Sequence, residues 1–348
     1  MSIKRIEQKA MTGLRRPVIY AYMILYIWVK YTIELVTFKI CPLGYVKFLV
    51  RLLRMAFALY PNKIMKIDGK YKYQLYLPAF PGKPFFHAMK KFDPRTKTPG
   101  PITVVFSMTK ACPYKCPHCY QRNDKGTDLE MGLLKKTARE MQEIGVSMFD
   151  IEGGEPLIQF ERLMDILSAF DERAELWVNT TGYRLTEEKA ERMKRAGVYG
   201  VMVSIHSADR ETYDKFTGVA GSFETAKKAI RIFQKYGIVT AINFCPTAED
   251  ILEGGVGRLM ELSKELNVSL VQVIHAKPSG GWLDKPDAIY DSSELMEKLY
   301  GYHEYYNHSD VADQYPSILF QVFEEDEKSF GCTAGGIDRF YLNHEGEV

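Results

Sequence analysis

Three cysteines lie close together at the end of an apolar run. Cys112, Cys116 and Cys119 are spaced C-x3-C-x2-C and follow residues 102–107. Three thiolates in so short a segment cannot all pair with one another, and a closed zinc site requires a fourth ligand. Cysteine thiolates also hold iron–sulfur clusters, and a cubane bound by three protein sulfurs leaves one iron open to a small molecule. The spacing therefore predicts a cluster with an open iron.

A zinc site is the alternative, with His118 or a distant residue as the fourth ligand. His118 lies between Cys116 and Cys119, where a short loop can hardly point all four groups at one metal. A zinc site of this kind would make the protein a non-catalytic metal-binding scaffold. Metal analysis separates the two hypotheses, because zinc without iron after anaerobic reconstitution would exclude the iron–sulfur enzyme.

A second motif strengthens the cluster hypothesis, and together the two motifs resemble the radical S-adenosylmethionine (SAM) enzymes. Gly153, Gly154, Glu155 and Pro156 follow the next predicted strand after the cysteines. In this resemblance the three cysteines bind a [4Fe-4S] cluster, and the amino and carboxylate groups of SAM chelate its fourth iron. The resemblance also implies that the Gly-Gly-Glu-Pro segment binds the amino group of SAM.

Four further residues match positions that line the SAM pocket in that superfamily. They are Asn179, Ser204, Asn243 and His118. The first three end predicted strands, and the resemblance implies stacking near the adenine for His118, with Tyr120 as the alternative. The polar strand ends could instead simply satisfy backbone groups. His275 and Lys277 are candidate substrate contacts, and no residue is assigned to the catalytic step itself.

Short apolar strands and amphipathic helices alternate regularly from Ile102 onward. The predicted strands are 102–107, 147–152, 175–179, 200–206, 238–244 and 268–274. The predicted helices are 129–144, 158–171, 186–196, 221–236 and 249–266. Such βα repeats predict an α/β fold with a parallel sheet and right-handed crossovers. The resemblance implies an open, partial (β/α)6 TIM-like barrel, with the active site at the carboxyl ends of the strands.

The amino-terminal region, residues 1–60, is basic and apolar. It contains ten Lys or Arg and two acids, Glu7 and Glu34. Residues 17–29 are apolar without interruption, and residues 45–60 have an amphipathic helical pattern with basic residues on one face. We expect a helical extension at the inner face of the membrane. The alternatives are a spanning helix and a helical hairpin that packs on the catalytic part or on a second subunit.

Four regions are predicted along the chain. They are the extension 1–60, a linker with a short strand at 61–101, the radical SAM core 102–281 and a terminal segment 282–348. In the terminal segment, residues 331–335 and 341–348 resemble the opening of a SPASM or twitch module. Because no cysteine follows Cys332, we assign no auxiliary cluster; either the polypeptide is truncated or Cys332 carries no cluster.

The composition is that of a globular protein, with 46% hydrophobic and 26% charged residues. The six cysteines are clustered or scattered in a way that does not predict a disulfide framework, so a reducing cytoplasmic compartment is expected. Nucleic-acid binding is not expected, because the basic residues are interleaved with aliphatic runs and no recognised RNA or DNA motif occurs.

The resemblance also implies a reaction. One electron, from a donor such as flavodoxin or ferredoxin, would pass from the cluster into SAM and cleave it to methionine and a 5′-deoxyadenosyl radical, which takes hydrogen from a substrate. The hydrophobic extension favours a lipid or membrane-associated substrate. The SPASM-like terminus favours the alternative, a peptide or protein substrate. The cofactors are therefore expected to be the [4Fe-4S] cluster and SAM, whose chemistry the protein directs.

Overall fold

A curved parallel sheet forms the body of the protein. The computed structural model describes residues 6–59, 62–93, 95–96, 100–284, 292–324 and 339–348. The eight strands of the sheet run in the order β10-β9-β8-β7-β6-β5-β4-β11, with parallel neighbours throughout. Their bounds are β4 (Thr103–Ser107), β5 (Met148–Glu152), β6 (Glu175–Thr180), β7 (Val198–Ser204), β8 (Val239–Phe244), β9 (Leu270–Val273), β10 (Ser317–Phe320) and β11 (Arg339–Leu342). The open, partial α/β barrel is confirmed, with one more strand at each edge than the six predicted.

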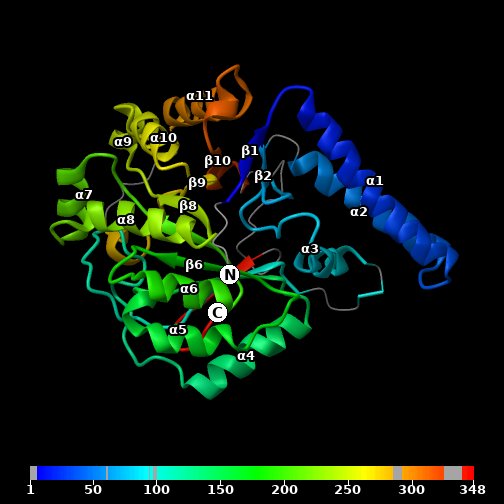
Figure 1. The fold of residues 1–348 in the computed structure, drawn as a ribbon, viewed down its shortest axis with the longest axis horizontal. Helices are drawn as coiled ribbons and strands as arrows, with labels where there is room; N and C mark the ends of the chain where they lie inside the picture. Colours follow the sequence, from blue (N-terminus) through cyan, green and yellow to red (C-terminus); the bar gives the residue numbers. More distant parts are fainter. Residues whose placement is uncertain (1–5, 60–61, 94, 97–99, 285–291, 325–338) are drawn as a thin grey trace.

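Helices cover the outer face of this sheet (Figure 1). They are α4 (Met131–Glu143), α5 (Phe160–Leu167), α6 (Glu187–Arg195), α7 (Arg210–Thr217), α8 (Ser222–Lys235), α9 (Ala248–Leu252), α10 (Gly255–Glu265), α11 (Ser293–His308) and the short α12 (Gln321–Glu324). Their buried side chains recur at helical spacing, as Ala226, Ala229, Ile230 and Phe233 do on α8. The apolar faces of the helices therefore form one core with the outer face of the sheet.

Two of the predicted helices differ from the observed ones. The predicted helix 249–266 is interrupted, because Gly254 has a positive φ of 82° and lies between α9 and α10. The predicted helix 158–171 begins as a 3-10 turn, Pro156–Gln159, and α5 ends at Leu167. Helix α7 was not predicted at all; it starts at Asp209, whose carboxylate caps the amide of Thr212.

The segment predicted as a linker folds against the amino ends of the barrel strands. Strands β2 (Ile64–Ile67) and β3 (Lys70–Lys72) form an antiparallel sheet with β1 (Gln8–Met11), and α3 (Lys83–Ala88) follows. Ala10, Met65 and Ile67 pack with Trp177 and Leu270 inside the barrel. Within the part of the chain that the structure describes, these side chains therefore fill the barrel interior at the amino ends of the strands.

The amino-terminal extension is a helical hairpin that projects as an arm from the body (Figure 1). Its helices are α1 (Arg15–Val36) and α2 (Pro42–Leu59), joined by the stacked rings of Tyr31 and Phe48 at 3.7 Å. Tyr22 and Tyr26 of α1 pack against Phe80 of the linker segment, and α2 contacts the 3-10 turn Met89–Phe92. By length and composition α1 could also cross a membrane, with a mean hydropathy of 1.3 over 18 residues.

Candidate active site

The three cysteines line a cavity of about 550 Å³ at the carboxyl ends of the strands. The other predicted site residues on its wall are His118, Gly153, Gly154, Asn179, Ser204 and Asn243. Tyr120, His275 and Lys277, which were considered as further contacts, line it as well. Glu155 and Pro156 do not line the cavity. The sequence motifs, widely separated along the chain, thus meet in one place.

The loop after β4 carries the cysteines and is fixed from two sides. The amide of Lys115 donates to the carbonyl of Thr217 at the end of α7, at 2.9 Å, and the amide of Gly281 donates to the carbonyl of Cys119, also at 2.9 Å. A Cβ at Gly281 would overlap the carbonyl oxygen of Pro117. The loop and the segment after β9 therefore approach so closely that only glycine fits between them.

Gly153 and Gly154 pack against the start of the same loop. The amide of Gly154 donates to the carbonyl of Thr109 at 2.7 Å, and a Cβ on Gly154 would overlap the carbonyl of Ala111. Gly153 has a φ of +149°, which other residues rarely adopt. In this structure the two glycines allow their own backbone to pack closely against the backbone of residues 109–111, which directly precede the first cysteine. Their predicted contact with SAM stays a prediction.

Glu155 supports the cavity from behind the wall. Its carboxylate accepts hydrogen bonds from the hydroxyl of Thr180 at 2.5 Å, from the amide of Thr181 at 2.7 Å and from the amide of Leu157 at 3.0 Å. Burial raises the pKa of this carboxyl, and these hydrogen bonds oppose the rise. Because Thr180 and Thr181 both line the cavity, Glu155 fixes the end of β6 and need not touch a ligand itself.

A polar group that the sequence analysis did not assign lies on the cavity wall at the end of β5. The hydroxyl of Tyr120 donates to the carboxylate of Glu152, and Nδ2 of Asn179 donates to the other carboxylate oxygen at 2.7 Å. Burial raises the pKa of Glu152 to about 7, and the Asn179 hydrogen bond partly opposes it. The sequence offered one indication that Glu152 belongs to the site, because this residue directly precedes the two glycines.

His118 lies among aromatic rings. Its ring centroid is 4.4 Å from that of His206, 4.9 Å from Phe216 and 5.6 Å from Trp282. Burial lowers the pKa of His118 to about 4, so the ring is neutral at physiological pH. A neutral ring beside aromatic side chains offers a flat apolar surface in the cavity, which is compatible with the predicted stacking against adenine.

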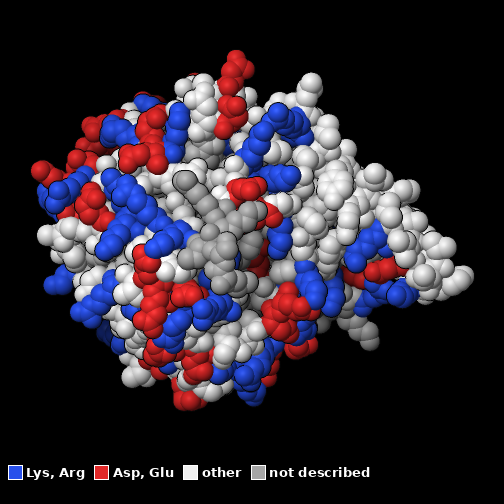
Figure 2. Space-filling view, viewed as in Figure 1, with Lys and Arg blue, Asp and Glu red and all other residues white. Residues whose placement is uncertain are grey.

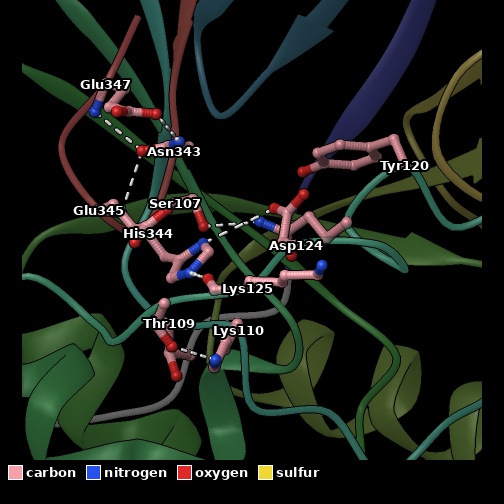
Figure 3. Close-up of polar contacts among 12 residues, drawn as sticks. Ser107, Thr109, Lys110, Tyr120, Asp124, Lys125, Asn343, His344, Glu345 and Glu347 are labelled. Carbon is pink, nitrogen blue, oxygen red and sulfur yellow. Dashed lines mark hydrogen bonds and ion pairs between the residues drawn. The ribbon is translucent and has the colours of Figure 1, made fainter.

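The end of the chain holds the outgoing part of the cysteine loop (Figure 3). Gln121 Nε2 donates to the hydroxyl of Tyr341 on β11 at 2.7 Å and to the hydroxyl of Ser107 at 2.8 Å. Beyond β11, His344 reaches the loop residues Asp124 and Lys125, with 3.7 Å from its Nδ1 to the carboxylate of Asp124. The sequence analysis missed this contact. Cys332 lies outside the described residues.

The comparisons with known proteins concern the same part of the chain. The sequence model of the Radical SAM superfamily matches residues 106–250, which contain all three cysteines and both glycines. Over these residues the chain is similar to the Radical SAM superfamily. The chain is also 24% identical over 200 residues to the PqqA peptide cyclase of Granulibacter bethesdensis, covering 57% of this chain and 53% of that protein.

Two further comparisons concern another relative and a solved structure. The chain is 28% identical over 186 residues to the AdoMet-dependent heme synthase of Methanosarcina barkeri, covering 53% of each. It thus spans about half the length of the curated relatives that it matches. The structure of Streptococcus suis SuiB bound to its precursor peptide SuiA superposes with a TM-score of 0.58 at 18% identity, covering 70% of this chain and 58% of SuiB. At that identity the likeness concerns the fold alone.

The cavity fits the two groups that radical SAM proteins bind, a [4Fe-4S] cluster and SAM. Cys112, Cys116 and Cys119 are free thiols on one loop, and three sulfurs leave one iron of a cubane open. Buried Oδ1 atoms of Asn179 and Asn243 have no hydrogen-bond partner. Unpartnered buried acceptors are costly, so a polar ligand with donor groups suits this wall.

Cys112 is exposed at the cavity, and Cys116 and Cys119 are half-buried. Burial raises the pKa of Cys112 to about 11 and that of Cys116 to about 12, and it also raises the pKa of Cys119. The metal-free chain therefore keeps these thiols protonated at neutral pH. Since only thiolates bind iron, assembly of a cluster must release protons from the loop.

Proposed function

We propose that this protein is an enzyme that cleaves SAM reductively and uses the product to take hydrogen from a substrate. The observation that carries the proposal is the meeting of three free cysteines with Gly153 and Gly154 in one cavity at the carboxyl ends of the strands. Bound together, a reduced cluster and SAM would supply a 5′-deoxyadenosyl radical and methionine.

The side chains of the cavity would serve binding and exclusion rather than the radical step itself. Cys112, Cys116 and Cys119 would hold three irons, and the polar ends of β6 and β8, Asn179 and Asn243, would bind polar groups of SAM. His118 would pack against the adenine. The apolar side chains that fill the barrel at the amino ends of its strands support a reaction that is shielded from water on that side.

The proposed reaction needs a one-electron donor, and we propose a flavodoxin or a ferredoxin in the cytoplasm. Support comes from cluster chemistry, since reductive cleavage of SAM consumes one electron for each molecule cleaved. The described free cysteines, which include the exposed Cys41 and the buried Cys245, also suit a reducing compartment. No nucleic-acid partner is proposed.

A peptide or protein is one of two candidates for the substrate. It is favoured by the names of the relatives, a PqqA peptide cyclase and a SuiB bound to a precursor peptide. The terminal segment supports the same candidate, because residues 331–335 and 341–348 resemble the opening of a SPASM or twitch module. A lipid is the other candidate, supported by the apolar extension.

We further propose that the protein is peripheral at the inner face of the membrane. Support comes from the composition of the amino-terminal arm, which is apolar and rich in Lys and Arg. Co-sedimentation of the purified chain with vesicles tests this proposal independently of any SAM chemistry.

Metal analysis and spectroscopy test the enzyme proposal. After anaerobic reconstitution we expect about four irons for each chain and a signal of the reduced cluster that changes when SAM is added. Cys119→Ser should lose both, whereas Cys245→Ser, which removes another thiol from the same cavity wall, should keep both. Bound zinc without iron would contradict the proposal, and so would a cluster whose spectroscopic signal does not change when SAM is added.

A further inference from the structure

The outer face of α1 carries an apolar stripe that nothing in the described protein covers. Val18, Leu25, Val29, Ile33 and Val36 recur at intervals of seven, four, four and three residues, and each is at least 43% exposed. This spacing places them on one side of the helix. Tyr20, Met23, Ile27 and Tyr31 occupy the opposite side and are buried. Helix α1 is thus apolar on two faces, and only one of them packs on the body.

Helix α2 carries a matching stripe. Leu43, Val46, Val50 and Leu53 are spaced by three, four and three residues and are each at least 45% exposed. Lys47 and Arg54 are exposed at helical positions beside this stripe. Apolar residues flanked by Lys and Arg are the pattern of a helix that lies in a membrane interface.

The charge of the arm suits an anionic surface. Residues 14–59 contain seven basic residues, Arg15, Arg16, Lys30, Lys39, Lys47, Arg51 and Arg54. Their only acid, Glu34, is paired with Arg95 of the body at 2.9 Å. In Figure 2 the outer part of the arm is largely uncharged, with basic atoms grouped toward one edge. An anionic bilayer complements the apolar stripes and the basic side chains of the arm. Its lipid chains can contact the stripes, and its negatively charged headgroups can pair with Lys and Arg.

The packing of α1 favours a helix that lies flat over one that spans. Its buried residues belong to one apolar cluster with Phe80, Phe85 and Met89 of the body. The Glu34–Arg95 pair ties the second half of the helix to the body. To cross a bilayer, α1 would have to leave these contacts and carry the charged side chains of Lys30 and Glu34 into hydrocarbon, which is unfavourable.

The arm and the cavity belong to opposite ends of the barrel. The segment on which the arm packs joins the amino ends of the strands, since the amide of Ala79 donates to Glu175, the first residue of β6, at 2.7 Å. Ile102, directly before β4, is part of the cluster with α1. The cavity instead opens beyond the carboxyl ends, where Thr180 and Ser204 line it. The stripe on α1 faces away from the body, because the opposite side of the helix belongs to the apolar cluster at the strands' amino ends.

We infer that the α1–α2 arm lies flat in the interface of an anionic bilayer and holds the cavity so that it opens toward the water. This inference rests on the proposed membrane association and extends it to the substrate. The reacting part of the substrate must then reach the cavity from the aqueous side, as a peptide or a soluble molecule does. A lipid chain embedded in the same bilayer would not reach it.

Vesicle binding by the reconstituted full chain tests the arm. We expect binding to phosphatidylcholine vesicles that contain phosphatidylglycerol, and loss of most of that binding in Leu25→Glu. The matched control is Leu133→Glu, which changes an exposed leucine on α4 and should bind as the wild type does. The double variant Lys47→Gln/Arg54→Gln should bind on the order of tenfold more weakly.

Tryptophan fluorescence tests the orientation. Trp28 is 44% exposed beside the stripe on α1, whereas Trp177 and Trp282 are buried. Brominated lipid should quench the emission of Trp28, and Trp28→Phe should abolish that quenching. In the same background, Leu283→Trp places a reporter at an exposed position next to Trp282 of the cavity wall, and we expect it to stay unquenched.

Three results would overturn the inference. They are vesicle binding by Leu25→Glu equal to that of the wild type, quenching of the residue 283 reporter, and a dimer formed through the arm that binds no vesicles. Unchanged cluster absorbance in Leu25→Glu would show that the variant is folded. Because vesicle binding requires neither SAM nor electrons, its failure would leave the radical SAM proposal intact, and the reverse also holds.

Discussion

The amide of Leu129 donates a 2.7 Å hydrogen bond to the carbonyl of His344, joining the exit of the cysteine loop to the turn after β11. The ring of His344 adds a second link, with 2.9 Å between its Nε2 and the carbonyl oxygen of Lys125. The ring is fully buried. The last residues of the chain therefore brace the loop that offers the three thiols.

Removal of the His344 ring should loosen this brace without changing any cavity residue. We expect His344→Ala to lose about 1–3 kcal/mol of stability, because the hydrogen bond to the carbonyl of Lys125 is lost and the removed ring leaves a cavity at a buried position. The loosened loop should also release iron to a chelator faster than the wild type does. His344→Gln, which keeps a donor, should recover part of the iron retention; equal iron release by all three proteins would show that the turn does not brace the loop.

Gly154→Ala should damage the same loop from the other side. The added Cβ would overlap the carbonyl of Ala111, so the chain between Thr109 and the first cysteine must move. We expect a clear fall in cluster content after reconstitution. Gly301→Ala is the control, since no atom lies within 4 Å of the added Cβ in α11. That control should be neutral or up to about 1 kcal/mol more stable. A full cluster in Gly154→Ala would disprove the packing argument.

Asp150 should make the stability of the protein dependent on pH. Burial raises the pKa of Asp150 from 3.8 to about 7, partly opposed by its hydrogen bond from Asn179. Between these values the unfolded chain releases a proton that the folded chain keeps, so the carboxyl lowers stability as pH rises and the loss is complete above pH 7. Asp150→Asn lacks this effect.

The measurement for Asp150 is the free energy of unfolding in urea at pH 5 and at pH 7.5. The advantage of Asp150→Asn over the wild type should be larger at pH 7.5, by up to a few kcal/mol. An equal difference at both pH values would show that Asp150 titrates in its ordinary range.

The sequence predicted the sheet well between residues 102 and 274, where each strand and the helix after it form a local periodic unit. It could not predict that β10 and β11 extend the sheet at both edges. The pairing of β11 with β4 joins residues far apart in the chain, and β11 has only four residues. Local periodicity carries no information about such pairing.

For the candidate site, the sequence singled out the cysteines and both glycines because their types and spacing are restrictive. The structure brings these residues together in one cavity, and their roles stay predictions. Glu155 turned out to lie behind the wall, because its carboxylate is occupied by the end of β6. The brace by His344 could not be predicted, since it depends on the pairing of β11.

The central claim is tested most directly by SAM cleavage. The reconstituted protein, reduced with dithionite under anaerobic conditions, should convert SAM to 5′-deoxyadenosine and methionine. Cys116→Ser should form none, and Cys245→Ser should form it as the wild type does. Absence of 5′-deoxyadenosine from a wild-type protein that carries a complete cluster and binds SAM would contradict the account.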